Sequence, residues 1–299
     1  MFRLAHLTDP HLPFPRRPRI RHLASKRVIG FSNWVRGRKQ IHRPDILDTL
    51  VADIHASGVD HIACTGDLVN IATPDEFLPA RRFLERLGGP DFVSLVPGNH
   101  DAYAGVWTEH AWREWGPYMT GDVPVERDRE KHFAGFPWLR RRGSVALVGI
   151  SSAVTTRPFR ASGRVGDRQL QRIADVLAEL KGEDLYRIVL IHHSPIPGDR
   201  SRDLHDGARL CDLLLDCGAD LVLHGHDHVA TLNAVNRDGQ TIPVICTPSA
   251  SALPHGRKPG AQWSLIEVER KGNAHAATLE RRSVTAPGAP LEVVEKVSL

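Results

Sequence analysis

The chain has 299 residues, of which 41% are apolar and 25% charged, with a mean hydropathy of −0.27 and a formal net charge of +4. This composition predicts a soluble globular protein with a substantial core, and the length fits one large domain or two small ones. No run approaches the roughly 18 apolar residues of a membrane-spanning helix, which excludes an integral helical membrane protein.

The chain begins with MFRLAHLTDPH, which has no basic region followed by an apolar one, so we expect no signal peptide. The four cysteines lie in apolar surroundings without CxxC spacing: Cys64, Cys211, Cys217 and Cys246. Free thiols in a reducing compartment are the expected state, which predicts a cytoplasmic protein. Peripheral contact with the inner membrane face is kept as an option.

The segment after the first predicted strand is strongly basic. No acidic residue lies between Asp9 and Asp45, whereas ten of the 39 basic residues do, and the other 29 are outnumbered by 35 acidic ones. The ten are Arg16, Arg17, Arg19, Arg21, Lys26, Arg27, Arg36, Arg38, Lys39 and Arg43. Phe14, Phe31 and Trp34 are interleaved with them. Two interpretations stay open: a solvated basic face, or a surface that attracts an anionic substrate, phospholipid headgroups or nucleic acid.

Short apolar runs that end in turn residues alternate with helical patterns along the chain. Strands are predicted at 2–8, 61–66, 92–98, 145–151, 187–193, 221–225 and 241–248, and two more, 263–270 and 274–282, flank a turn at 271–273. Helices are predicted at 43–58, 73–89, 166–182 and 203–218. In the second helix Thr73 is the N-cap, Glu76 its capping-box partner and Gly88 the stop.

The alternation of strands and helices predicts an α/β fold with largely parallel strand pairing. We expect a single domain spanning residues 1–299, because no linker or repeat interrupts the chain. It would carry a basic insertion at about 12–43 and a C-terminal β-rich part at about 262–299.

Polar groups suited to metal binding follow five of the predicted strands. They form the motifs Asp9-Pro10-His11, Gly66-Asp67, Gly98-Asn99-His100-Asp101, His192-His193 and Gly225-His226-Asp227-His228. Because the carboxyl ends of parallel strands meet at one edge of a sheet, all five can share one crevice. Carboxylates, imidazoles and carboxamides are ligands for borderline divalent metals, and the glycines before Asp67, Asn99 and His226 permit tight turns and close backbone approach.

The order D-x-H, G-D, G-N-H-D, H-H and G-H-x-H resembles the calcineurin-like metallophosphoesterases, over residues 2 to about 250. The stretches TGDLVNIATPDEF and LVPGNHD, with the helix in GRVGDRQLQRIADVLAEL, are most similar to bacterial class III cyclic-nucleotide phosphodiesterases and glycerophosphodiesterases. The resemblance implies a four-layer α/β/β/α sandwich in which two mixed sheets are flanked by helices and two metal ions lie at the edge.

The resemblance also implies a role for each motif residue. Its metal ligands are Asp9, His11 and His228 for the first ion, Asn99, His192 and His226 for the second, and Asp67 bridging both. His100 is implied as the proton donor to the leaving group. His224 is interpreted as structural or as a support for the ligands, and His193 likewise, although the sequence does not choose cleanly between His192 and His193.

One position departs from the protein phosphatase branch of that family. That branch has G-D-x-x-D, whose second aspartate orients the catalytic histidine, and here Asn70 occupies the position. An amide does not stabilise an imidazolium as a carboxylate does, which argues against that branch. The orienting partner of His100 is therefore open, with Asp101 as a candidate.

The expected cofactors are two divalent transition-metal ions, Mn or Fe in the first place with Zn as an option, because the implied ligands include no thiolate. The implied reaction is attack of a metal-bridging hydroxide on phosphorus, with proton transfer from His100 to the leaving oxygen. The expected function is hydrolysis of a small phosphodiester, either a cyclic nucleotide or a glycerophosphodiester.

Three alternatives stay open. The first is a hydrolase of lipid-linked phosphoesters or nucleotide-lipid pyrophosphates, in which the basic segment contacts an anionic membrane surface. The second is a nuclease, but no coiled coil or capture domain follows residue 250, and nucleic acid is not the expected partner. The third is an inactive binding protein of the same fold. The loss of a metal ligand would favour it, but none of the implied ligands is missing from the sequence. The expected partner is a small anionic phosphoester, and the sequence does not indicate an oligomeric state.

Overall fold

Two six-stranded mixed sheets form the centre of the protein. The computed structural model describes residues 1–23, 25–104, 107–123, 135–285 and 289–299. The first sheet has the order β12 (Leu291–Ser298), β11 (Ala274–Val284), β10 (Gln262–Lys271), β1 (Phe2–Leu7), β2 (His61–Cys64), β3 (Val93–Leu95). The second has the order β4 (Trp138–Arg142), β5 (Val145–Gly149), β6 (Tyr186–Leu190), β7 (Leu221–His224), β9 (Gln240–Cys246), β8 (Thr231–Arg237). Strands β1 to β3 are parallel, as are β5, β6, β7 and β9, whereas the outer strands pair antiparallel.

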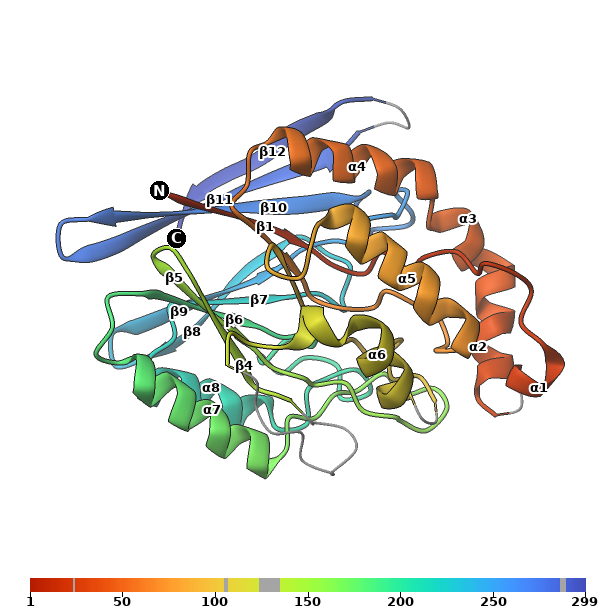
Figure 1. Cartoon of the computed structure of the whole chain (residues 1–299), viewed down its shortest axis with the longest axis horizontal. Helices are drawn as coiled ribbons and strands as arrows, with labels where there is room; N and C mark the ends of the chain where they lie inside the picture. Colours follow the sequence, from red (N-terminus) through yellow and green to blue (C-terminus); the bar gives the residue numbers. More distant parts are fainter. Residues whose placement is uncertain (24, 105–106, 124–134, 286–288) are drawn as a thin grey trace.

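Helices cover the outer faces of both sheets, so the expected sandwich of two mixed sheets is confirmed (Figure 1). On one side lie α4 (Pro44–Ala56), α5 (Pro74–Leu87) and α6 (Trp107–Trp115), and on the other α7 (Asp167–Leu180) and α8 (Gly207–Cys217). Successive residues of a strand point to opposite faces. In β5, Val145 and Leu147 therefore join the core between the sheets, while Ala146 and Val148 join the core under α7 and α8.

The four predicted helices correspond to α4, α5, α7 and α8. In α5 the predicted capping box is present: Thr73 and Glu76 bond reciprocally at the start, and Gly88 follows the last residue. The sequence patterns missed α6, the 3₁₀ turn η2 (Gly116–Met119), and the strands β4, β8 and β12. The two predicted C-terminal strands are β10 and β11, with the turn where it was expected.

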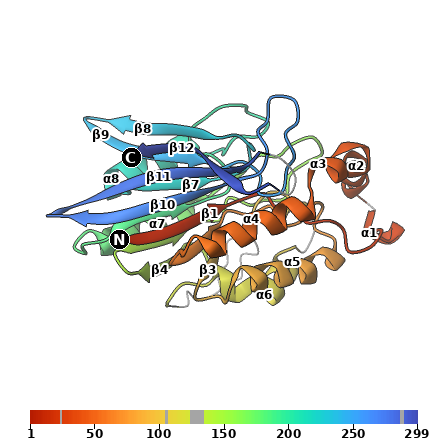
Figure 2. The same cartoon turned by 90° about the horizontal axis from the view of Figure 1, so that it is seen from above.

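The basic segment, residues 16–43, folds into short helices at one end of the molecule (Figure 1). They are α1 (Ile20–Leu23), α2 (Arg27–Asn33), the π-helical turn η1 (Trp34–Arg38) and α3 (Lys39–Ile41). Figure 2 shows these helices at the end opposite to the two chain termini. Arg27 ties the segment to the body of the protein, because its guanidinium donates hydrogen bonds to the carbonyls of Ile71, Ala72 and Ala104.

Candidate metal centre

The residues of the five motifs lie in loops at the carboxyl ends of β1, β2, β3, β6 and β7. Five of them have a positive φ, a conformation that residues other than glycine rarely adopt: Asp9, His11, Asp67, His226 and His228. Glycine is required beside them, since a Cβ on Gly98 would overlap Asp67 and a Cβ on Gly225 would overlap Thr8. Such strain persists only where the surroundings over-determine the backbone, as functional sites do.

A first group of donor atoms gathers around Asp9. The Oδ1 atom of Asp9 lies 3.0 Å from Nε2 of His228 and 3.7 Å from Nε2 of His11, and the two Nε2 atoms are 3.3 Å apart. The other oxygen, Oδ2, accepts hydrogen bonds from the Thr8 hydroxyl and from the backbone N–H of His226. His11 donates its Nδ1–H to the carbonyl of Val69 (3.3 Å), which leaves a lone pair on Nε2 toward the group.

A second group gathers around Asn99. Its Oδ1 atom lies 2.8 Å from Nδ1 of His226 and 3.1 Å from Nε2 of His192. His192 donates its Nδ1–H to the carbonyl of Thr65 at 2.6 Å, which fixes the ring and directs the lone pair of Nε2 at this point. One carboxamide oxygen and two imidazole nitrogens thus converge as a mixed N/O ligand set does.

Asp67 lies between the two groups. Its Oδ2 atom is 3.4 Å from Nε2 of His192 and 3.8 Å from Nε2 of His11, while Oδ1 accepts the backbone N–H of His100 at 2.7 Å. The Asp101 carboxylate holds this loop by accepting the backbone N–H groups of Asp67, Gly98 and Val69. Asp67 therefore stands where a carboxylate shared by two metal ions would stand.

The electrostatics of this cluster suit a cation. Burial alone would raise the pKa of Asp9, but His228, His192 and His11 around it hold that pKa well below its usual range. Burial is the largest single influence on the pKa of His192 and lowers it, yet Asp67, Asp9 and the Thr65 carbonyl together outweigh burial and raise the pKa to about 10. The buried carboxylates thus favour a positive charge at this point, and a metal ion that replaces the Nε2 proton of His192 would supply it. The donor set fits the two ions that the sequence implied.

His100 lies beside the cluster without joining either group. Its Nδ1–H donates to the backbone carbonyl of Asn70, so the candidate partner Asp101 does not orient it. The Asn70 side chain donates instead to the carbonyl of Leu12. Arg38 from η1 donates to Nε2 of His100 at 2.9 Å, and burial together with Arg38 lowers the pKa of His100 to about 4.

The structure separates the two histidines that the sequence could not. Both ring nitrogens of His193 have hydrogen-bond partners, the hydroxyl of Ser152 at 2.8 Å and the carbonyl of Ala161 at 3.0 Å. His192 faces Asp67 and Asn99 instead, which favours it as the ligand. His224 is buried one position before Gly225, with Nδ1 bonded to the carbonyl of that glycine.

Two side chains of the basic segment reach the cluster, and no motif indicated them. Arg38 contacts His100, and His42 brings its ring within 4.6 Å of the His11 ring, measured between centroids. The only signal in the sequence was the excess of positive charge, which marked the segment but not these two residues.

One family of known proteins matches most of the chain. A sequence model described as calcineurin-like phosphoesterase matches residues 2–230. None of the curated proteins matches the chain.

Solved structures with the same fold include two phosphatases and a nucleotidase. A dimetal phosphatase from Danio rerio has a TM-score of 0.64 at 12% identity, covering 99% of this chain and 98% of that one. A purple acid phosphatase from yellow lupin (Lupinus luteus) seeds has a TM-score of 0.58 at 14% identity, covering 99% of this chain and 53% of that one. The NAD nucleotidase of Haemophilus influenzae has a TM-score of 0.50 at 13% identity, covering 99% and 49%. At these identities the likeness shows the fold alone.

Proposed function

The chain belongs to the calcineurin-like phosphoesterase family, and we propose that it is a dimetal phosphodiesterase that hydrolyses a small diester, a cyclic nucleotide or a glycerophosphodiester. The bacterial class III phosphodiesterases remain the proposed subtype. One observation carries the proposal: the two donor groups that share Asp67 lie directly beside His100, a histidine that is not itself part of either group and that we propose as the proton donor. The proposed ligands are those that the sequence implied, with Mn or Fe as the proposed ions.

The residues of the site would have different roles in such a hydrolysis. When bound, two metal ions activate a water molecule and neutralise charge on the phosphoryl oxygens. His100, held through Nδ1 by the Asn70 carbonyl, presents Nε2 to the leaving oxygen and protonates it, a step worth roughly 10²–10⁴-fold in rate. Nε2 of His100 accepts a hydrogen bond from Arg38 and therefore carries no proton before substrate binds. With substrate present, Arg38 would bind a non-bridging oxygen instead, and the charge of the phosphate would let His100 take up from solvent, at Nε2, the proton that it then donates.

A cavity of about 190 Å³ next to His100 supports a substrate that continues beyond phosphorus. Lys26, Arg38, Tyr103 and Arg160 are among the residues that line it. A group attached through the leaving oxygen would enter this cavity, where cations and an aromatic ring can contact a sugar, base or glycerol headgroup. A phosphomonoester with a small leaving group would leave it unused.

A panel of substrates with Mn²⁺ tests the proposal. It contains bis-p-nitrophenyl phosphate, p-nitrophenyl phosphate, 2′,3′- and 3′,5′-cyclic AMP and glycerophosphocholine. We expect kcat/KM on at least one of the diesters to exceed that on p-nitrophenyl phosphate by tenfold or more, on the order of 1.4 kcal/mol. A monoester cleaved faster than every diester would contradict it.

The surface of the basic segment favours a second candidate, a hydrolase of lipid-linked phosphoesters. Three of its apolar side chains are exposed: Ile20 (88%), Val28 (56%) and Val35 (54%). Phe14, Phe31 and Trp34 pack against one another instead, so they are less free to anchor than the sequence suggested. Exposed apolar side chains among basic ones suit the interface of an anionic membrane. Among the described residues, none of the helices has the length and apolar character needed to cross a bilayer.

Vesicle co-sedimentation distinguishes this second candidate. Arg17, Arg19 and Arg21, changed together to Gln, should weaken binding to phosphatidylserine vesicles at low salt, since each basic residue near such a surface contributes about 1 kcal/mol. The matched control changes Arg81, Arg82 and Arg86, three exposed residues of α5, to Gln. Equal binding by the two triple variants, or no binding by the wild type, would remove this candidate.

A further inference from the structure

His42 occupies a defined place between the basic segment and the metal centre. It follows α3, and its backbone forms an antiparallel bridge with Ala252. The neighbouring hydrogen bonds run from Arg43 N to the Ser251 carbonyl (2.9 Å) and from Leu253 N to the Ile41 carbonyl (2.8 Å). The side chain is buried. His42 is therefore held in position on both sides by the chain around residue 252, although 210 positions separate the two in sequence.

The hydrogen bonds of His42 decide which ring nitrogen is free. Nδ1 lies 2.9 Å from Oγ of Ser251. The Ser251 hydroxyl donates its one hydrogen to the carbonyl of Pro10 at 2.6 Å, so toward His42 it can only accept. Nδ1 of His42 therefore carries the proton and Nε2 keeps a lone pair. A ligating histidine has this arrangement, in which one nitrogen donates to the protein and the other binds the metal.

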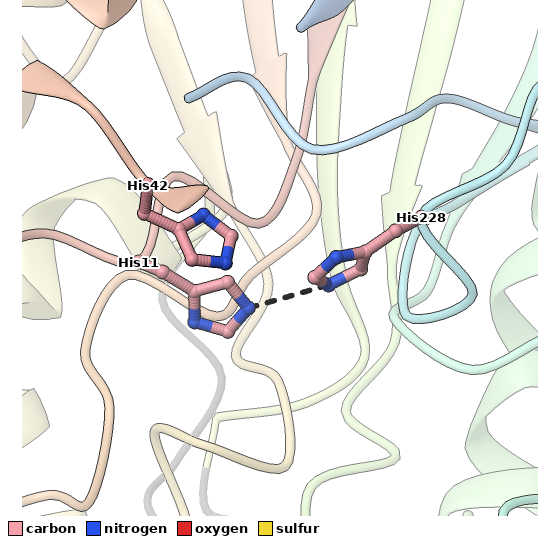
Figure 3. Close-up of side chains that lie close together, drawn as sticks. All are labelled: His11, His42 and His228. Carbon is pink, nitrogen blue, oxygen red and sulfur yellow. Dashed lines mark hydrogen bonds between the residues drawn. The ribbon is translucent and has the colours of Figure 1, made fainter. Parts of the chain in front are cut away.

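The free nitrogen faces the first donor group. The ligand atoms of His11, His42 and His228 all lie within 4.8 Å of one another. Figure 3 shows the three rings around one gap, with His42 directly above His11 and His228 opposite. Nitrogens that bind one ion at about 2.1 Å lie at most about 4.2 Å apart, so the trio is already close to the size that a single ion requires.

We propose that His42 is an additional ligand of the first metal ion, beside Asp9, His11, His228 and the shared Asp67. The inference rests on the proposed dinuclear site, and it makes the basic segment part of that site. It also makes the two metal positions unequal, because the first gains a third imidazole while the second keeps Asn99, His192 and His226. Nitrogen-rich coordination favours borderline metals over hard ones, so the first position should be the tighter one for Co²⁺ and Zn²⁺.

Metal titration of the chelator-treated full chain tests the role of His42. Calorimetry with Mn²⁺ gives the affinity of each binding step, and the visible absorption of Co²⁺ reports the ligands of the ion. We expect His42→Ala and His42→Gln to weaken one of the two steps by about 10- to 100-fold or more and to change the Co²⁺ spectrum. Added imidazole should restore affinity in His42→Ala, because it fits the space that the side chain leaves.

Two further variants keep the test decisive. His22→Ala removes a histidine of α1 in the same basic segment and should titrate as the wild type does. Ser251→Ala keeps the imidazole but removes the nearer partner of its Nδ1 (2.9 Å) and leaves Oγ of Ser249 at 3.4 Å, so it should weaken the same step by less than His42→Ala. Circular dichroism checks the folding of each variant. If His42→Ala does not fold, Ser251→Ala and His42→Gln test whether His42 is a metal ligand.

Unchanged affinities and an unchanged Co²⁺ spectrum in a folded His42 variant would overturn the inference. The outcome is independent of the substrate panel. If the wild type binds two ions, the His42 variants bind one of them more weakly and no diester is cleaved, the ligand role is supported and only the proposed reaction is contradicted. Normal diester hydrolysis with His42-independent metal binding refutes the ligand role and leaves the proposed reaction standing.

Discussion

The loops that follow the strands and the basic segment meet at the same site but are built in opposite ways. The loops are buried and strained, and five of their ligand candidates have a positive φ: Asp9, His11, Asp67, His226 and His228. The basic segment consists of helices of three to seven residues in which no residue is buried. Two of its side chains, Arg38 and His42, reach the cluster, and Lys26 lines the cavity next to His100.

The difference shows what each region contributes. The loops are cross-linked by side chain to backbone bonds such as those of Asp101 and Asp9, which hold donor atoms in place before any ligand arrives. The segment places cationic and imidazole groups at the rim, where a substrate enters. Substitutions in the loops should therefore abolish the site, whereas substitutions in the basic segment should alter the affinity of the site for metal and substrate and its selectivity.

The largest expected effect follows from Asp67→Ala. Since Asp67 Oδ2 faces both donor groups, the variant should lose both metal ions and more than about 10³-fold in hydrolysis rate. Metal content after dialysis and kcat on bis-p-nitrophenyl phosphate measure this. Asp48→Ala on the exposed face of α4 is the matched control. Retention of one full equivalent of metal by Asp67→Ala would show that the carboxylate does not bridge.

The next effect separates proton transfer from metal binding. His100→Ala should keep both metal ions but lose roughly 10²-fold or more in rate on diesters with alkoxide leaving groups. It should lose far less on bis-p-nitrophenyl phosphate, because p-nitrophenolate leaves without a proton. Comparing kcat for glycerophosphocholine and for bis-p-nitrophenyl phosphate is the measurement. Equal losses on the two substrates would refute the role of His100 as the acid.

Within the basic segment, Arg38 and Arg36 offer an internal comparison. Both lie on η1, but only Arg38 turns toward His100, and Arg36 is exposed. Arg38→Ala should lower kcat/KM by about 10- to 100-fold, the value of a hydrogen bond to a charged group. Arg38→Lys should not restore it, because lysine lacks the planar fork. Arg36→Ala should stay within twofold of the wild type, and an equal loss in both variants would mean that the segment acts only through its total charge.

The two regions also differed in how far the sequence could predict them. The clustering of the loops after the strands could be predicted from the sequence, because each motif follows an apolar run and parallel strands bring their carboxyl ends together. The capping box at Thr73 and Glu76 could also be predicted, because its two residues are only three positions apart in the sequence. By contrast, the position of His42 depends on a bridge to Ala252, a contact distant in sequence that no periodicity reveals.

Other misses have similar physical reasons. The edge strand β8 is mostly exposed, so it shows no buried alternation, and α6 spans only nine residues without a clear capping residue. The partner of His100 was not predictable, because it is the backbone carbonyl of Asn70 and every residue has a carbonyl. The positive φ angles of the five ligand candidates were not predicted, because Asp and His adopt a positive φ more often than most other residues but still in a minority of cases.

The smallest expected effect concerns a buried histidine outside both regions. Burial, and next Arg140, lower the pKa of His61 to about 3, and its Nε2 bonds the Ser94 hydroxyl. As the pH falls below about 6.5, His61 is protonated in the unfolded chain but stays neutral in the folded protein, so the free energy of unfolding declines. Between pH 7.5 and 5.5 this costs about 1 kcal/mol. Urea unfolding at the two pH values should show a smaller decline for His61→Gln than for the wild type, and equal declines would contradict the assignment.

In the proposed function the loops hold two metal ions that act together on a phosphodiester. The most direct measurement titrates chelator-treated protein with Mn²⁺ while following both bound metal and hydrolysis of bis-p-nitrophenyl phosphate. We expect activity to be absent without metal and to rise until two equivalents are bound per chain. Full activity in the metal-free protein, or saturation at one equivalent, would contradict it.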